Sequence, residues 1–146
     1  MTEVAVPFRV LPHLTDRTTA FWQGGEHGEL RFHRCRSCGF WLHPPVPICS
    51  ACGSSEVAPE AVSGRARVLT FTTNYQAWMP GPELPYVVAI VAIEEDPRVR
   101  LTTNIVGCAP EEVRIDMPVE VVFEHHPDPD GDIWIPLFRP IGGAES

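Results

Sequence analysis

Five stretches of apolar, β-branched and aromatic residues, separated by turn-forming residues, follow one another after Gly64 and predict β-strands. They are ARVLTFTTNY (66–75), YVVAIVAIEE (86–95), VRLTTNIV (99–106), VEVVFEHH (119–126) and DIWIPLFRP (132–140). The segment at 76–85 contains three prolines and predicts a long loop. APEEV at 109–113 predicts a single helical turn between the third and fourth strands. This order of elements is that of a five-stranded OB-type barrel.

The N-terminal part of the chain has a different pattern. TDRTTAFWQ (15–23) predicts a short helix with Thr15 or Asp16 as its cap, ended by Gly24 and Gly25. GELRFHR (28–34) predicts a strand, and the prolines of WLHPPVP (41–47) exclude a central strand there. The helix is too short to be stable alone, so it must pack against the rest of the chain.

Four of the five cysteines form the pattern C-x2-C-x10-C-x2-C between these elements. They are Cys35, Cys38, Cys49 and Cys52. Each pair is followed by a glycine, the residue that most easily adopts the positive φ angle of a metal-binding knuckle. Four thiolates complete a tetrahedral shell and leave no open position, which predicts a structural Zn²⁺ rather than a catalytic one. Two redox-active pairs are the alternative, but neither precedes a thioredoxin-like helix.

Together these patterns predict a mainly β protein with three parts. Residues 1–28 are an N-terminal arm and short helix, 29–60 a rubredoxin-like zinc ribbon, and 61–146 the OB-type barrel. The fifth cysteine, Cys108, lies in the apolar stretch NIVGCAP and is interpreted as a small buried side chain.

Composition excludes several functions. The 11 basic residues are all arginines, so the chain alone has no lysine for Schiff-base chemistry or for a P-loop. The net charge of -8 opposes general nucleic-acid binding, although OB barrels often bind oligonucleotides and that alternative stays open. We find no apolar run long enough to span a membrane and no signal-peptide pattern, and we expect a cytoplasmic protein.

One combination of motifs resembles a known family. FWQGGEHGELRFHRCRSCGFWLHPPVPICSACGSS, followed by GRARVLTFTT, PYVVAIVAIEE and MPVEVVFEH, is similar to the acyl-CoA-associated zinc-ribbon and OB-fold family called domain of unknown function 35. RLTTNIVGC and DIWIPLFRP resemble the branch attached to steroid enoyl-CoA hydratases. The chain departs from the family at Asp116, where a glycine is usual, but aspartate tolerates the left-handed conformation of such a turn.

The resemblance implies a function without catalysis by this chain alone. Members of that branch bind a lipid-transfer-protein-like thiolase homologue, an aldolase that shortens steroid side chains. We therefore expect an accessory subunit that helps to shape or stabilise the acyl-CoA site of such an aldolase, in a heterotetramer around the partner's dimer. The resemblance also implies a steroid enoyl-CoA hydratase as a further partner, because this branch is attached to such hydratases. The alternative is a module that binds acyl-CoA and passes it between hydratase and aldolase.

Two sets of side chains are candidates for these contacts. Arginines could hold CoA phosphates through bidentate bonds, or they could form local ion pairs on a solvated face; they are Arg31, Arg34, Arg36, Arg65 and Arg67. Exposed aromatic and methionine side chains are typical interface anchors, although packing of the ribbon against the barrel would also account for them. These residues are Phe21, Trp22, Phe40, Trp41, Trp78 and Met79. His125 and His126 are interpreted as strand-end polar residues, with acid–base chemistry at the barrel rim as the alternative.

Overall fold

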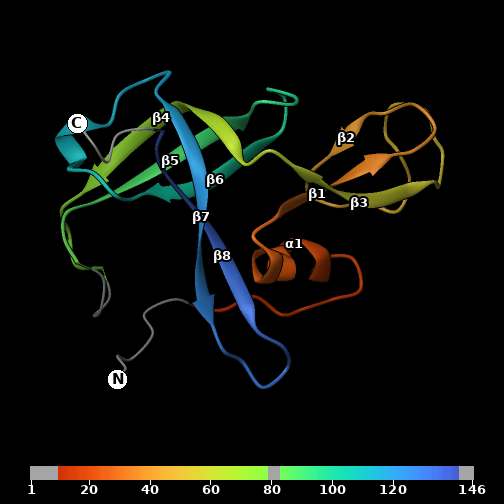
Figure 1. Ribbon diagram of the computed structural model, residues 1–146, viewed down its shortest axis with the longest axis horizontal. Coiled ribbons are helices and arrows are strands. Elements are labelled where there is room, and N and C mark those ends of the chain that lie inside the picture. The colour runs from red at the N-terminus through yellow and green to blue at the C-terminus, as the bar shows by residue number, and fades with distance from the viewer. Residues whose placement is uncertain (1–9, 79–82, 142–146) are drawn as a thin grey trace.

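A small three-stranded sheet and a closed five-stranded barrel lie side by side, with a short helix below the junction between them (Figure 1). The computed structural model describes residues 10–78 and 83–141. Met79, one of the predicted interface residues, lies outside the described residues. The mainly β fold class with one short N-terminal helix is confirmed.

The small sheet carries the cysteine pattern and has the strand order β2-β1-β3. It consists of β1 (Leu30–Cys35), β2 (Trp41–Leu42) and β3 (Val57–Val62). β3 was not predicted, because the sequence VAPEAV alternates weakly between apolar and polar residues and contains Pro59. In the structure, half of its residues are exposed to solvent. It pairs with the whole of β1, from Leu30 opposite Val62 to Cys35 opposite Val57. As an outer strand of the sheet, β3 tolerates the proline.

The barrel strands close in the order β4-β5-β6-β8-β7, with β7 pairing back onto β4. They are β4 (Arg65–Asn74), β5 (Tyr86–Ile93), β6 (Arg100–Ile105), β7 (Pro118–His126) and β8 (Ile133–Pro140), with the turn η2 (Pro110–Glu112) between β6 and β7. Neighbouring strands are antiparallel except β6 and β8, which meet in parallel at Ile105 and Phe138. This is the predicted five-stranded OB-type barrel, with its helical turn between the third and fourth strands.

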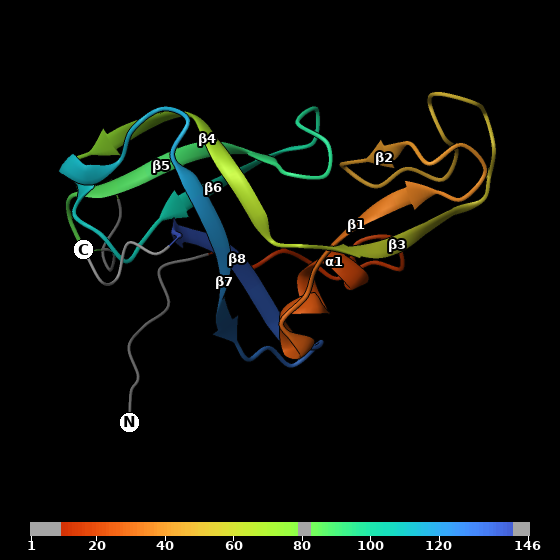
Figure 2. The ribbon, with the colours of Figure 1, turned by 45° about the horizontal axis from the view of Figure 1, so that its top comes forward.

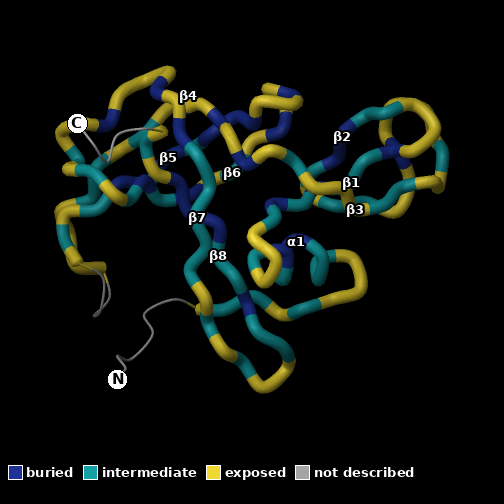
Figure 3. The backbone as a smooth tube through the Cα atoms, viewed as in Figure 1, coloured by how far each residue is buried: buried dark blue, intermediate teal, exposed yellow. Residues whose placement is uncertain are grey.

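The interior of the barrel holds the main hydrophobic core (Figure 3). Val91, Val119 and Phe138 are fully buried there, in three different strands. The last three residues of β5 are buried in succession, which accounts for its nearly continuous apolar sequence. β3 passes into β4 through Ser63 and Gly64 alone, so one extended path joins the ribbon to the barrel (Figure 2). The predicted division at residues 60 and 61 falls within β3 and stays a prediction.

The helical segment lies four residues later than predicted and has the same length of nine residues. α1 (Thr19–Gln23) continues directly into the 3₁₀ turn η1 (Gly24–His27), so Gly24 and Gly25 do not end the helical backbone. A Cβ on Gly25 would lie 2.4 Å from the Cβ of Trp134 in β8. The second glycine of FWQGG is therefore needed for close approach of this turn to the barrel. No helix in the described ranges 10–78 and 83–141 is long and apolar enough to cross a membrane.

Candidate functional site

The four cysteines of the ribbon bring their sulfur atoms together. All four Sγ atoms lie within 4.8 Å of one another, with 3.6 Å between Cys35 and Cys52 and 3.7 Å between Cys38 and Cys49. A tetrahedral zinc with sulfur ligands at about 2.3 Å requires separations of about 3.8 Å between the sulfurs. The donor set and its spacing therefore fit a Zn²⁺ ion.

Two matching knuckles produce this geometry. Gly39 and Gly53 have φ angles of 82° and 80°, and their N–H groups donate to the carbonyl oxygens of Cys35 and Cys49, both at 2.8 Å. The N–H of Ala51 donates to Cys49 Sγ at 3.3 Å. Each knuckle thus needs a residue that tolerates positive φ at the same position, as the sequence indicated.

The thiols in this cluster differ in how readily they ionise. The backbone N–H of Cys38 stabilises the thiolate of Cys35 and lowers its pKa to about 6. At Cys52 the N–H of Ser54 acts in the same direction, but the neighbouring sulfurs of Cys35 and Cys38 outweigh it and raise the pKa to about 12. Four thiolates at this spacing repel one another, and a divalent cation removes that repulsion.

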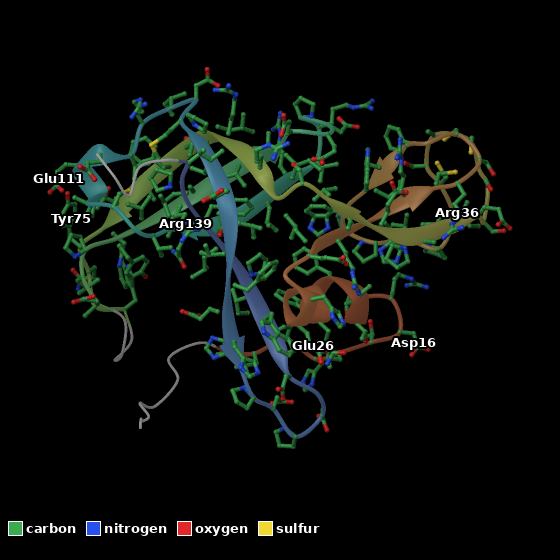
Figure 4. All side chains as sticks on the ribbon, viewed as in Figure 1. Asp16, Glu26, Arg36, Tyr75, Glu111 and Arg139 are labelled. Atoms are coloured by element: carbon green, nitrogen blue, oxygen red, sulfur yellow. The ribbon has the colours of Figure 1, made fainter. Side chains whose placement is uncertain are left out.

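The candidate arginines are divided between the ribbon and the barrel. Each of four lies next to a carboxylate: Arg31 at 2.8 Å from Glu29, Arg34 at 3.1 Å from Glu60, Arg65 at 2.7 Å from Glu94, and Arg67 at 3.9 Å from Asp116. Arg36 is exposed at the far end of the ribbon, beside the cluster of sulfur atoms (Figure 4). These local ion pairs are what the alternative interpretation expects, while binding of CoA phosphates stays untested.

The candidate interface residues differ strongly in exposure. Phe21 and Trp41 retain 6% and 8% of their surface and belong to the core. Trp22 is half-buried next to Phe21, with ring centroids 4.8 Å apart. Trp78 is 74% exposed, and its Nε1 donates to Asn74 Oδ1 at 2.7 Å. Trp78 is therefore an exposed aromatic side chain with a hydrogen-bonded indole, and its role as an interface anchor stays a prediction.

Phe40 takes part in a contact that sequence reasoning missed. Arg98, in the turn between β5 and β6, places its guanidinium carbon 4.8 Å from the centre of the Phe40 ring. Asp96 orients this guanidinium through bonds of 3.0 Å and 2.9 Å, and the bond from Arg98 lowers the pKa of the Asp96 carboxyl. The three residues join ribbon and barrel. The sequence could not indicate this contact, because a contact so distant in sequence leaves no local signal.

The histidines at the end of β7 are each hydrogen-bonded to a carboxylate on the barrel rim. His125 Nε2 lies 2.8 Å from Asp132 Oδ2, and its ring stacks on Trp134 at 4.4 Å. The hydrogen bond from His125 lowers the pKa of the Asp132 carboxyl. His126 Nε2 lies 2.8 Å from Glu124 Oε1. These pairings agree with the interpretation as strand-end polar residues.

The four-cysteine ribbon followed by a closed five-stranded barrel defines a zinc-ribbon and OB-fold protein. Two family models match the chain: "ChsH2, rubredoxin-like zinc ribbon domain" over residues 22–58, and "ChsH2, C-terminal OB-fold domain" over residues 59–124. A DUF35 domain-containing scaffold protein from Methanocaldococcus jannaschii is 38% identical over 101 residues, which cover 68% of this chain and 70% of that protein. The chain belongs to the DUF35 family.

Two further relatives carry functional names. A 3-oxo-4,17-pregnadiene-20-carboxyl-CoA hydratase alpha subunit from Mycobacterium tuberculosis is 34% identical over 125 residues, covering 86% of this chain and 39% of that subunit. A solved structure of an Ltp2-ChsH2(DUF35) aldolase matches with a TM-score of 0.77 and 32% identity, covering 90% of this chain and 99% of that chain. The chain spans less than two fifths of the length of the hydratase alpha subunits that it matches.

Proposed function

We propose that this chain is a non-catalytic accessory subunit of an enzyme that acts on acyl-CoA thioesters, and that its partner is a thiolase-like aldolase. The observation that carries the proposal is the likeness to the matched chain of the Ltp2-ChsH2(DUF35) aldolase, which covers 99% of that solved chain and 90% of this one. The hydratase name of the mycobacterial relative supports a steroid side chain as the acyl group and a hydratase as a further partner. A cytoplasmic location and a heterotetramer around the partner's dimer complete the proposal.

The cysteine cluster supports a structural role for the ribbon. Zinc would be held by Cys35, Cys38, Cys49 and Cys52, and it would cross-link two knuckles that otherwise share little hydrophobic core. In this chain the small ribbon core consists of Cys35, Leu42 and Cys49, with Phe40, Val46 and Val57 packed against it. Because four thiolates fill the tetrahedral shell, no position remains for substrate or water.

The surface supports association with another protein. Trp78 lies beyond the end of β4, close in sequence to Tyr75, which is 72% exposed. Asn74 restricts Trp78 through its hydrogen bond, so less side-chain entropy is lost when this indole becomes buried against a partner. The partner would supply the nucleophile, acid and base, and the contact with this chain would orient the substrate and exclude water.

Co-expression with the thiolase-like aldolase of the same genome tests the proposal, with affinity purification and light scattering of the eluted complex. We expect the two chains to elute together, and we expect Trp78→Ala to weaken association at least tenfold, as removal of a central aromatic anchor does. Leu69→Ala is the matched control, because Leu69 is also exposed but lies on the outer face of β4. Separate elution of the wild-type chains would contradict the proposal.

A further inference from the structure

A cavity of about 1100 Å³ lies at the mouth of the barrel. Its walls come from the segment at 10–12, from α1, from residues 83–87 at the start of β5, from residues 104–108 at the end of β6, from Glu124 of β7, and from the middle of β8. Barrel mouths are common places for small-molecule sites, whose volumes are typically about 300–1000 Å³. This cavity is therefore large enough for a ligand the size of several fused rings.

The walls are mainly apolar. The apolar side chains that line the cavity include Leu11, Trp22, Val87, Ile105, Ile135 and Leu137. Polar groups are few: Asn104, whose Nδ2 donates to the carbonyl oxygen of Val87 at 2.8 Å, and the phenol-bearing Tyr86 also line the cavity. Apolar walls with a few placed polar groups are typical of sites for uncharged organic ligands.

The charges on the walls exclude one part of an acyl-CoA molecule. Glu83 and Glu124 line the cavity, and no arginine or histidine does so among the residues that the structure describes. The Glu83 carboxylate repels the phosphates of CoA, and the Glu124 carboxylate, which is paired with His126, offers them no donor. The cavity therefore suits the acyl group and not the nucleotide.

We propose that this cavity binds the uncharged, ring-containing hydrocarbon part of an acyl thioester, while the CoA portion stays outside it. The inference rests on the proposed function, because acyl thioesters are the substrates assigned to the complex. It differs from binding through the arginines, which would hold the opposite end of the ligand. The chain would then position the acyl group and leave the thioester to the partner.

Progesterone is a suitable probe, because it is an uncharged four-ring ketone without CoA. We expect it to bind the full chain at one site with a micromolar dissociation constant, measured by calorimetry and by quenching of tryptophan fluorescence. Ile135→Trp, which fills the cavity, should weaken binding at least tenfold. Ile115→Trp is the matched control, because Ile115 is 59% exposed and does not line the cavity, and it should bind within twofold of wild type.

A second measurement does not depend on the folding of a variant. Cys108 lines the cavity, so bound progesterone should slow its alkylation by iodoacetamide in the zinc-loaded wild-type chain at least fivefold. Free CoA at the same concentration should neither slow alkylation nor displace progesterone. Displacement by CoA, absence of progesterone binding, or equal loss in both tryptophan variants would overturn the inference.

Elution with the aldolase is measured on the same preparations, which separates the two proposals. A chain that elutes with the aldolase but binds no progesterone overturns only the cavity inference. A chain that binds progesterone but never associates overturns the proposed function. A third outcome is that Ile135→Trp loses association with the aldolase while the wild type binds no progesterone. That outcome would show that the cavity receives a segment of the partner protein, and it would overturn the proposal that the cavity binds an acyl group.

Discussion

At the scale of single residues, Asp116 has the clearest backbone requirement. Its φ angle is 71°. All other described residues with a positive φ angle are glycines. Its carbonyl oxygen accepts a bond from Arg67 Nη1 at 3.0 Å, and its N–H donates to the carbonyl oxygen of Val68 at 2.7 Å. The turn before β7 thus depends on the conformation of Asp116 more than on its carboxylate.

We predict that Asp116→Val lowers the free energy of unfolding by about 1–2 kcal/mol, because a β-branched residue is strained in the left-handed region. Asp116→Gly should not lower it, since glycine adopts that region freely and the backbone bonds remain. Urea unfolding of both variants checks this. Equal losses in the two variants would mean that the carboxylate, not the backbone, stabilises the turn.

His43 is the residue with the clearest dependence on pH. Its ring lies 5.3 Å from Phe21 and 4.8 Å from Phe32, and its Nδ1 is buried without a hydrogen-bond partner. Burial, and then the neighbouring His33, lowers the pKa of His43 below its ordinary value. Protonation in the unfolded chain therefore begins at a higher pH than in the folded chain.

The direction in which stability changes with pH follows from this difference in the pKa of His43. Neutral His43 makes its full contribution to the free energy of unfolding above about pH 6.5. That contribution is lost as the pH falls toward the lower pKa of His43 in the folded chain. We predict that the free energy of unfolding decreases from pH 7 to pH 5, and that His43→Phe reduces this slope by at most about 1.4 kcal/mol per pH unit. Denaturant unfolding of the wild type and of His43→Phe at each pH checks this, because the contributions of all other titrating groups cancel in the comparison. Identical slopes would contradict the prediction.

At the scale of elements, the two knuckles explain why so short a ribbon folds. Their matching N–H bonds, from Gly39 to Cys35 and from Gly53 to Cys49, follow directly from the two C-x2-C-G sequences. The zinc site was therefore predictable from spacing. β3 was not, because its pairing with β1 depends on a partner that precedes it by more than 20 residues rather than on its own alternation.

We predict one zinc per chain, with Cys38→Ser losing the metal and the ordered ribbon. Structural zinc binds finger peptides with about 10–16 kcal/mol of apparent free energy, far more than this ribbon core can replace. The measurement is zinc content by a chromogenic chelator, together with proteolysis of the ribbon. Cys108→Ser is the control and should retain full zinc. A Cys38→Ser chain with wild-type zinc content would contradict the assignment.

At the scale of the whole molecule, the barrel order was predictable and the joining of its parts was not. Five strand-forming stretches and one helical turn indicated the OB order. The Asp96–Arg98–Phe40 contact, the packing of Gly25 against Trp134 and the cavity at the barrel mouth all join segments far apart in sequence. Each depends on how strands are placed, which the hydrophobic pattern does not encode.

The shape of the molecule also separates its candidate surfaces. Arg36 at the tip of the ribbon and Tyr75 near the far end of the barrel lie at opposite ends of the long axis (Figure 4). One small ligand cannot reach both ends, whereas a partner protein could contact both. With a net charge of -8 and most candidate arginines already paired, broad electrostatic attraction of CoA is not expected of this chain.

The accessory role is best tested by the rate of retro-aldol cleavage of a steroid acyl-CoA by the thiolase-like aldolase, measured with and without this chain. We predict at least a tenfold higher rate with the zinc-loaded chain, and no cleavage by the chain alone. The Trp78→Ala chain should need a higher concentration to reach the same rate, because it weakens association and not the chemistry. An aldolase that is equally active with and without the chain would contradict the account.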